Sequence, residues 1–296
     1  GPEYETVASF GPNCGVNDPK IIAKANNLCN LYGLDTISAG GVIAFAMECF
    51  EKGILSGEDT GGLKLKFGEG EAMLQLLEMI GERKGIGNIL AEGVRRAAKQ
   101  IGGGAEEYAI HSKGLEIAMH DPRAAQGVGV HYACTPTGGR HTEGLSLFRE
   151  LKTRFSTEGK GKLVKEVEDW NAFTQASGWC LFAVDARGYP SNEHMLKVYN
   201  AVTGLNLSLA DATMLGEKIF NLKKCFNVKH GCSKSEDTLP RRLLTLPTKA
   251  GAVVKLEELL PQYYEARGWD AATSKPSKEK LISLGLSDVA RDLWGD

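Results

Sequence analysis

The sequence lacks any long uninterrupted hydrophobic run. Nowhere in its 296 residues does a stretch approach the roughly 20 apolar residues that a membrane-spanning helix requires. The opening segment Gly1–Glu5 also lacks the charged and apolar regions of a signal peptide. A formal net charge of −2 gives no excess of one sign, which argues against a nucleic-acid partner. We therefore expect a cytoplasmic globular protein with no membrane span.

The sequence also lacks a disulfide framework. Its cysteines are odd in number and follow no regular spacing: Cys14, Cys29, Cys49, Cys134, Cys180, Cys225 and Cys232. This usage favours reduced thiols in a reducing compartment. Most of these cysteines are expected to be small core residues, because a free cysteine packs like a small apolar side chain.

Signals for β-strands are few. Only the segments 108–110 and 128–130 read as strands, and both are short and bounded or broken by glycine or small residues. Helical signals are stronger, and Asp18-Pro19 predicts a capped helix start followed by an apolar stripe up to Gly33. The expected fold class is mostly α, with two multihelical domains and little β structure.

Apolar residues repeat at helical spacing along most of the chain. Further helices are expected near residues 42–49, 73–80, 90–101, 163–178, 208–226 and 256–268, with Gly40-Gly41 separating the first of these from the preceding helix. Three glycines end the helix near residue 101, and residues 105–145 then show weak periodicity. We therefore expect one helical domain over residues 1–104 and a second over 105–296.

Two six-residue stretches share one pattern. In Asn30–Asp35 and again in Gln175–Cys180, an amide side chain stands three residues before a glycine, and an apolar residue follows that glycine. A glycine at this place is typical of a helix end, where it adopts the left-handed conformation. The simplest interpretation is therefore a glycine helix cap with an apolar contact, repeated once.

Other short motifs accompany this pair in a fixed order. They are Gly1–Thr6, Gly33–Ser38, Lys113–Glu116, Asp121–Arg123, Gly138–His141, Phe226–Val228 and Asp237–Pro240. Together they resemble the aldehyde ferredoxin oxidoreductase family of tungsten enzymes. The resemblance covers essentially the whole chain but only the second and third domains of the family. It therefore implies an N-terminal β-rich domain or subunit that forms the base of the cofactor site.

The resemblance implies a tungsten, or else molybdenum, bis-pterin cofactor. A pterin is flat and edged with N–H donors, and a helix end followed by glycine offers an acceptor side chain and exposed backbone groups. The implied pterin-binding residues are Asn30, Gly33, Leu34 and Asp35 in the first stretch, and Gln175, Gly178 and Trp179 in the second. The family has aspartate where this sequence has Asn30 and Gln175, and leucine where it has Trp179.

Two cysteines are implied as metal ligands. Cys180 matches the fourth thiolate of the family's [4Fe-4S] cluster, and the other three ligands lie in a cysteine run upstream of this chain, so one cluster ligand is expected here. Cys14 lies where some ring-reducing relatives are thought to bind the tungsten or molybdenum through a thiolate. Each could instead be an ordinary thiol.

Glu5 and His141 match family positions beside the metal and are the candidate catalytic residues. A carboxylate in a closed site and a histidine can both exchange protons near working pH. The alternatives are a helix-end carboxylate and a structural loop histidine, and either side chain could also orient the substrate by hydrogen bonding. Asp121-Pro122-Arg123 is expected to fix a turn that bridges the domains.

The expected function is the interconversion of a small aldehyde and its carboxylate, with ferredoxin as electron partner. An alternative within the family is a ring-reducing aromatic acyl-CoA reductase subunit, which Cys14 as metal ligand would favour. A third reading, motivated by Asn30 and Gln175, is a non-catalytic helical module that docks on a separate cofactor-base domain. Glycine-rich loops and apolar patches that face a missing domain make partner association or homo-oligomer formation expected.

Overall fold

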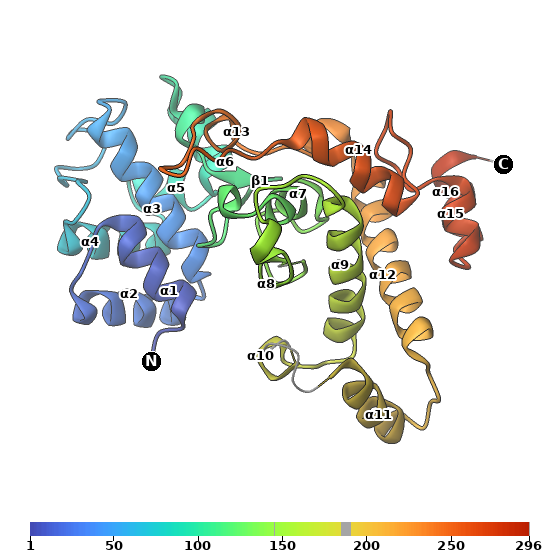
Figure 1. The fold of residues 1–296 in the computed structure, drawn as a ribbon. Helices are drawn as coiled ribbons and strands as arrows, with labels where there is room; N and C mark the ends of the chain where they lie inside the picture. The colour runs from blue at the N-terminus through green and yellow to red at the C-terminus, as the bar shows by residue number, and fades with distance from the viewer. Residues whose placement is uncertain (145, 185–190, 296) are drawn as a thin grey trace. The chain divides into compact units, whose positions relative to one another are not determined.

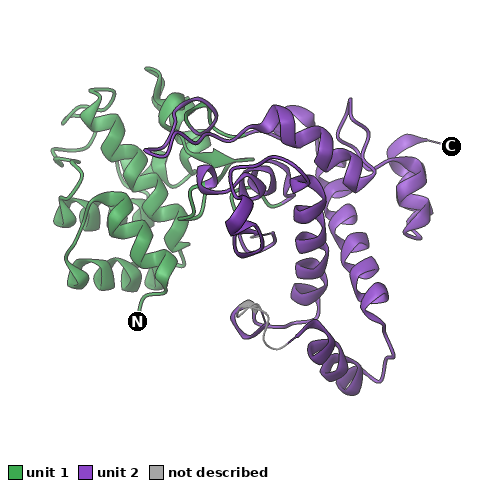
Figure 2. Cartoon of the chain, viewed as in Figure 1, with its two compact units in different colours: residues 1–121, 137–140, 239–242 green, residues 122–136, 141–238, 243–296 purple. Residues whose placement is uncertain are grey.

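The computed structural model describes residues 1–144, 146–184 and 191–295. It is 61% helical and 2% strand, which confirms the mostly α fold class (Figure 1). The chain divides into two compact units (Figure 2). The first comprises residues 1–121, 137–140 and 239–242, and the second comprises residues 122–136, 141–238 and 243–296.

The first unit consists of short and medium helices with one small hairpin. Its elements are α1 (Tyr4–Phe10), η1 (Pro12–Cys14), α2 (Pro19–Tyr32), α3 (Thr36–Glu51), α4 (Gly70–Glu82), α5 (Ile86–Leu90), α6 (Val94–Ile101), η2 (Ala105–Tyr108), β1 (His111–Ser112) and β2 (Leu115–Glu116). The predicted start of α2 is confirmed, because Asp18 accepts a hydrogen bond from the backbone N–H of Lys20 and Pro19 is the first helical residue.

Helix α3 forms the centre of the first unit, and most of its side chains are buried. The sequence predicted that Gly40-Gly41 separates two helices, and this prediction is wrong, because both glycines lie inside α3. The reason is a close approach between helices. A Cβ atom on Gly40 would lie 2.0 Å from Ser9 Oγ of α1, and Ser9 donates to the carbonyls of Thr36 and Ile37. Because Gly40 has no side chain, α1 can pack closely against α3, and α3 continues through this position.

The strand prediction over residues 108–110 is wrong by a few positions. Tyr108 ends η2, and the antiparallel pair is β1 with β2, with His111 opposite Glu116. Lys113 and Gly114 between the strands both have positive φ, at 53° and 91°, as in the tight hairpin turns that match strand twist. This hairpin extends the first compact unit to Asp121, beyond the boundary predicted at residue 104.

The second unit contains the longest helices of the described chain. Its elements are η3 (Pro122–Ala124), α7 (Gln126–Cys134), α8 (Leu147–Glu150), η4 (Leu151–Thr153), α9 (Lys160–Ala176), α10 (Leu181–Val184), α11 (Asn192–Thr203), α12 (Leu209–Lys229), η5 (Lys234–Glu236), α14 (Leu256–Arg267), α15 (Lys278–Ser283) and α16 (Ser287–Trp294). Helix α13 (Arg241–Thr245) begins in the last segment of the first unit.

Helices α9 and α12 lie side by side, and α14 packs against α9 (Figure 1). Gly216 permits this closeness, since a Cβ atom there would lie 1.7 Å from the backbone oxygen of Asp169. Ser208 and Asp211 form a capping box at the start of α12, which confirms the helix predicted to begin near residue 208.

The strand prediction over residues 128–130 is wrong, because this segment belongs to α7. All nine residues of α7 are buried. A helix that is buried on every side carries no amphipathic stripe, so its short apolar run could not be told from a strand by periodicity. Gly129 faces Val254, whose Cγ1 would lie 2.4 Å from an added Cβ atom.

Charged side chains are buried between α9 and α14. Arg267 is fully buried and pairs with Glu168, at 2.5 Å, and with Asp169. Glu168 also accepts a hydrogen bond from the Tyr263 hydroxyl at 2.5 Å and lies 2.7 Å from His131 Nδ1. Burial alone would raise the pKa of Glu168, but the Arg267 guanidinium and these hydrogen bonds hold it below its usual range.

Within the described residues, no single helix is long and apolar enough to cross a membrane. Only α2 and α3 taken together meet that test by length and composition, and they are bent by 116°.

Candidate functional site

Glu5 is held on the first helix of the first unit. The Glu3 side chain caps α1 by accepting a hydrogen bond from the backbone N–H of Glu5 at 2.8 Å. Glu5 is buried, and its Oε2 accepts a hydrogen bond from the backbone N–H of Met119 at 2.8 Å. The other carboxylate oxygen, Oε1, is thereby aimed at the segment that follows β2.

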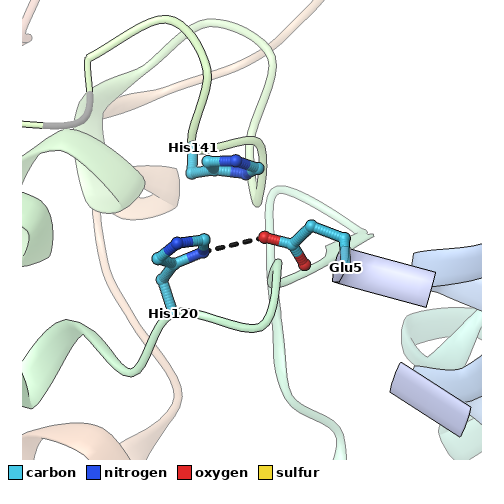
Figure 3. Close-up of side chains that lie close together, drawn as sticks. All are labelled: Glu5, His120 and His141. Atoms are coloured by element: carbon cyan, nitrogen blue, oxygen red, sulfur yellow. Dashed lines mark ion pairs between the residues drawn. The ribbon is translucent and has the colours of Figure 1, made fainter. Parts of the chain in front are cut away.

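His120 is the partner of that oxygen. Its Nδ1 lies 2.8 Å from Glu5 Oε1, as the dashed line in Figure 3 marks. The His120 side chain is 22% exposed and that of Glu5 is 4% exposed, so the pair reaches from the interior toward solvent. Tyr4 lies edge-on to the imidazole, with ring centroids 5.9 Å apart. Partial burial and the Glu5 carboxylate raise the pKa of Tyr4 to about 12, so its phenol stays protonated.

Backbone contacts hold the segment that carries His120. The Ala118 N–H donates to the Gly139 carbonyl at 3.0 Å, so residues 137–140 lie against the end of the hairpin in the first unit. Gly139 fits there because it has no side chain, since a Cβ atom would lie 2.4 Å from the Glu116 carbonyl oxygen. The glycine pair at 138–139 therefore supports the position of His120.

His141, also labelled in Figure 3, belongs to the second unit and is 7% exposed. Its carbonyl accepts a hydrogen bond from the Gly144 N–H at 3.3 Å, which closes a tight turn. Glu143 in this turn accepts a hydrogen bond from Thr135 Oγ1 at 2.9 Å and pairs with Lys223. The second unit therefore holds His141 in an ordered, buried loop.

The first predicted pterin-binding stretch is a turn between α2 and α3. Gly33 caps α2 in the left-handed conformation, with φ of 68°, and an added Cβ atom would meet only open space. Asn30 is exposed and Leu34 is half-buried. The Asp35 carboxylate caps α3 by accepting a hydrogen bond from the Ser38 N–H at 2.8 Å. Asp35 thus has a structural task at this turn.

The second stretch joins α9 to α10. Gly178 has φ of 78° and also faces open space. The Gln175 amide donates to the Thr142 carbonyl at 3.1 Å, which ties this helix end to the loop that carries His141. Trp179 is half-buried and Cys180 is exposed. The two stretches share the glycine turn but differ at their sixth residue, which caps a helix in one case and exposes a thiol in the other.

These turns suit a flat heterocycle with polar edges. A left-handed glycine that faces open space lets a ligand approach the backbone without meeting a side chain. Asn30 also presents an exposed amide with donor and acceptor atoms, whereas the Gln175 amide already donates to the Thr142 carbonyl and would offer chiefly its acceptor oxygen. The residues of both turns therefore fit the edge of a pterin.

The cysteines differ sharply in exposure. Cys180 is exposed, Cys232 is half-buried, and the other five are buried. Among the described thiols, Cys180 is thus the most accessible to an external metal cluster. Cys14 is fully buried, and its thiol donates to the Ser9 carbonyl at 3.3 Å. Burial raises the pKa of Cys14 to about 12, which opposes the thiolate form that a metal ligand needs. Its role as a ligand stays a prediction.

Sequence reasoning missed His120. It named the adjoining Asp121–Arg123 motif but not the histidine before it, because the contact with Glu5 joins positions more than a hundred residues apart. The one available signal was the position of His120 directly before that motif. Arg123, within the motif, donates to the Leu246 carbonyl at 2.8 Å inside the second unit.

The helical units and glycine turns match a known class of protein. The family profile described as "Aldehyde ferredoxin oxidoreductase, domains 2 & 3" matches residues 1–286. The chain belongs to this family.

Curated relatives agree with this assignment. The tungsten-containing aldehyde ferredoxin oxidoreductase of Pyrococcus abyssi is 38% identical over 303 residues, which cover 97% of this chain and 49% of the relative. An aliphatic sulfonate oxidoreductase, WOR-like subunit, of Pyrococcus furiosus is 31% identical over 310 residues, which cover 99% of this chain and 47% of that protein. The chain therefore spans about half the length of the curated relatives it matches.

A solved structure shares the fold. The active-site complex BamBC of benzoyl coenzyme A reductase, in complex with 1,5-dienoyl-CoA, aligns with a TM-score of 0.78 and 24% sequence identity. The alignment covers 97% of this chain and 49% of the solved chain. At this identity the likeness establishes the arrangement of helices and no shared substrate.

Proposed function

We propose that this chain is the C-terminal part of a tungsten bis-pterin oxidoreductase that oxidises a small aldehyde to its carboxylate and passes the electrons to ferredoxin. The observation that carries the proposal is the pairing of the buried Glu5 carboxylate with the half-buried His120, with 2.8 Å between Oε1 and Nδ1, in a chain of this family. Tungsten is favoured over molybdenum because relatives at 36–38% identity are named tungsten-containing enzymes. A cytoplasmic location is part of the proposal.

Each glycine turn holds one pterin in this proposal. Asn30, Gly33 and Leu34 would face the first pterin, with Asp35 fixing the turn through its cap on α3. Gln175, Gly178 and Trp179 would face the second. The open space at both glycines supports these roles, since a ligand can reach the backbone N–H and C=O groups there.

The chain's own chemistry is proton transfer. When bound, the tungsten group would accept two electrons as RCHO and H2O become RCOOH and two protons. Glu5 Oε1 would take a proton from the reacting water and pass it to His120 Nδ1. His120, at 22% exposure, would release it toward solvent. His141 is the second candidate proton carrier, and its burial suits a group that also orients substrate oxygen.

Electrons would leave the site through the [4Fe-4S] cluster. Cys180 would supply one ligand, and the N-terminal cofactor-base domain would supply three. The exposure of Cys180 supports this role, because a thiol on an open turn is accessible to a cluster held by another domain. Ferredoxin would then receive the electrons singly.

The proposal can be tested on the holoenzyme, which contains this chain together with the N-terminal domain. We expect aldehyde-dependent reduction of ferredoxin, and a loss of kcat of at least about 100-fold in Glu5→Gln, since a general base contributes about 10²- to 10⁴-fold. Glu3→Gln is the matched control, because it changes a carboxylate two residues away and keeps an acceptor for the Glu5 N–H. An unchanged kcat in Glu5→Gln would remove Glu5 from the reaction.

His120→Asn tests the relay separately from Glu5. Asparagine can hydrogen-bond Glu5 but cannot exchange a proton near neutral pH. We expect a lower kcat and the loss of a protonation step from the pH profile, with KM little changed. A pH profile identical to that of the unmodified enzyme would assign His120 a purely structural role.

A further inference from the structure

The loop that carries His141 is anchored at the end away from that residue. Glu143 is buried, and its carboxylate pairs with Lys223 of α12. Gly144 packs against α7 so closely that an added Cβ atom would lie 2.2 Å from His131 Nδ1. Two helices of the second unit therefore fix this end of the loop.

The residue next to His141 is held from a different helix. The Thr142 carbonyl accepts a hydrogen bond from Gln175 Nε2, near the end of α9, at 3.1 Å. This bond sets the plane of the peptide group between Thr142 and Glu143, because a peptide group is planar and rigid. The bond is partly buried, and a hydrogen bond shielded from water is electrostatically stronger. The backbone between His141 and the anchored Glu143 therefore has a defined course.

Gln175 also belongs to the second glycine turn. Its backbone carbonyl accepts a hydrogen bond from the Gly178 N–H at 3.1 Å, inside the turn that ends α9. Its side chain leaves that turn and binds the loop that carries His141. One residue therefore connects a turn proposed to face a pterin with a loop that carries a candidate proton carrier.

This connection requires a hydrogen-bond donor at position 175. A carbonyl oxygen only accepts hydrogen bonds, so the NH2 group of the Gln175 amide must face Thr142. An ionised carboxylate carries no donor and could not make this bond. The family resemblance implies an aspartate at this position, so the glutamine of this chain makes a contact that the implied residue would lack.

We propose that Gln175 is a positioning residue that acts through His141. Its amide N–H orients the His141 loop, and its backbone lies in the second glycine turn, so this residue sets the place of the imidazole relative to that turn. The proposal rests on the proposed function, since His141 contributes to the reaction as a proton carrier or by orienting substrate oxygen.

The first test removes the donor in the holoenzyme. Gln175→Glu keeps the length of the side chain and an acceptor oxygen but has no N–H. We expect peptides that cover residues 141–144 to exchange their amide hydrogens about 2- to 12-fold faster, as the loss of one hydrogen bond predicts. Mass spectrometry measures this exchange. Unchanged exchange in this loop would overturn the proposal.

Two further variants isolate the cause of faster exchange. Gln175→Met is similar in length and has neither donor nor charge, so it should give the same increase and separate the lost donor from an added charge. Gln262→Glu is the matched control, because the Gln262 amide also donates to a backbone carbonyl, that of Glu258, at 2.8 Å. Exchange of residues 141–144 should stay unchanged in this control.

A double-mutant cycle tests whether Gln175 acts through His141. Gln175→Glu alone should lower kcat about tenfold or more, because a misplacement of about 1 Å can reduce the rate about 10²-fold. In a His141→Asn background the same substitution should change kcat less than about twofold, since the group that it orients is gone. Equal losses of kcat in both backgrounds would overturn the role through His141.

Hydrogen exchange and pterin fluorescence separate this proposal from the proposed function. Faster exchange in both Gln175 variants, with the control unchanged, supports the positioning contact even if the unmodified enzyme oxidises no aldehyde. Aldehyde oxidation with a kcat unaffected by Gln175→Glu overturns the positioning role and leaves the proposed function standing. Loss of pterin fluorescence in Gln175→Glu without faster exchange of the loop would also overturn it, because Gln175 would then act on the pterin alone.

Discussion

The two compact units bury different kinds of side chain. The core of the first unit is a continuous apolar cluster centred on α3. The second unit buries ion pairs, including Arg267 with Glu168 and Asp169, Lys160 with Glu150, and Lys224 with Asp237. Overpacking an apolar core costs about 1–3 kcal/mol, whereas removing one partner of a buried ion pair costs about 3–5 kcal/mol. The second unit should therefore be the more sensitive to single charge changes.

Arg267→Met gives the largest expected effect. It removes the buried guanidinium that pairs with Glu168 and Asp169 and leaves Asp169 only its ion pair with Lys165 at 2.7 Å, which should lower the free energy of unfolding by about 3–5 kcal/mol. Arg291→Met is the matched control, since Arg291 pairs with Asp288 on an exposed helix face and should contribute at most about 1 kcal/mol. Denaturant unfolding, with hydrogen exchange of α9, measures both. A loss for Arg267→Met no larger than that of the control would contradict the difference between the units.

Gly40→Ala is the corresponding test in the first unit. The added methyl group would collide with Ser9, so α1 must shift away from α3, at a cost of about 1–3 kcal/mol. Gly57→Ala is the control, because Gly57 has no atom within 4 Å of its Cβ position. Hydrogen exchange should speed up in α1 and leave α9 unchanged. Unaltered exchange in α1 would mean that this close contact does not hold Glu5 in place.

Asp35→Ala sharpens the comparison between the two glycine turns. It removes the side-chain cap of α3 and should lower the free energy of unfolding by about 1 kcal/mol. Asp35→Ser, which keeps a capping oxygen, should recover most of that loss. Cys180→Ser, at the equivalent place in the second turn, should leave stability unchanged but abolish the electron paramagnetic resonance signal of the [4Fe-4S] cluster in the holoenzyme. An intact cluster signal in Cys180→Ser would exclude this ligand.

The smallest expected effect concerns the pH dependence of stability, which should have opposite signs around Glu168 in the second unit and Glu116 in the first. The pKa of Glu168 is lowered, so its contribution is present above the ordinary glutamate pKa of about 4.3 and is lost as pH falls through the lower folded value. Burial raises the pKa of Glu116, so the first unit is stabilised while that carboxyl is protonated and loses this contribution as pH rises above the ordinary value.

Hydrogen exchange corrected for intrinsic rates can measure this response. As pH is lowered toward and below about 4.3, the ordinary glutamate value, protection of α9 should fall and protection around β2 and α6 should rise. Glu116→Gln should remove the trend in the first unit alone. Parallel trends in the two units, or an unchanged trend in Glu116→Gln, would contradict this assignment of the pH response.

Local signals predicted much of the helical structure. The caps at Asp18 and Ser208 depend on atoms within a few residues, so the sequence identifies them directly. Gly40 was predicted as a break because local propensity cannot reveal that Ser9 of another helix needs the space. The buried helix α7 was predicted as a strand for a similar reason, since its environment removed the polar face that identifies a helix.

In the candidate site, too, the features set by neighbouring residues could be predicted from the sequence, and those set by distant contacts could not. The glycine turns are local, and their backbone conformation follows from Gly33 and Gly178. The Glu5–His120 pair is not local, because it forms only when the hairpin brings residues 118–120 beside α1. No pattern in one sequence encodes such a contact.

The most direct test of the central claim is the cofactor content of the assembled protein. The chain is purified anaerobically together with the proposed N-terminal domain, which would carry the other three cluster cysteines, and its tungsten and pterin are measured by elemental analysis and pterin fluorescence. The account predicts tungsten with two pterins for each chain, and loss of both when Gly33 and Gly178 are replaced by valine in a protein that stays folded. Absence of tungsten, molybdenum and pterin from the folded complex would contradict it and favour a non-catalytic helical module.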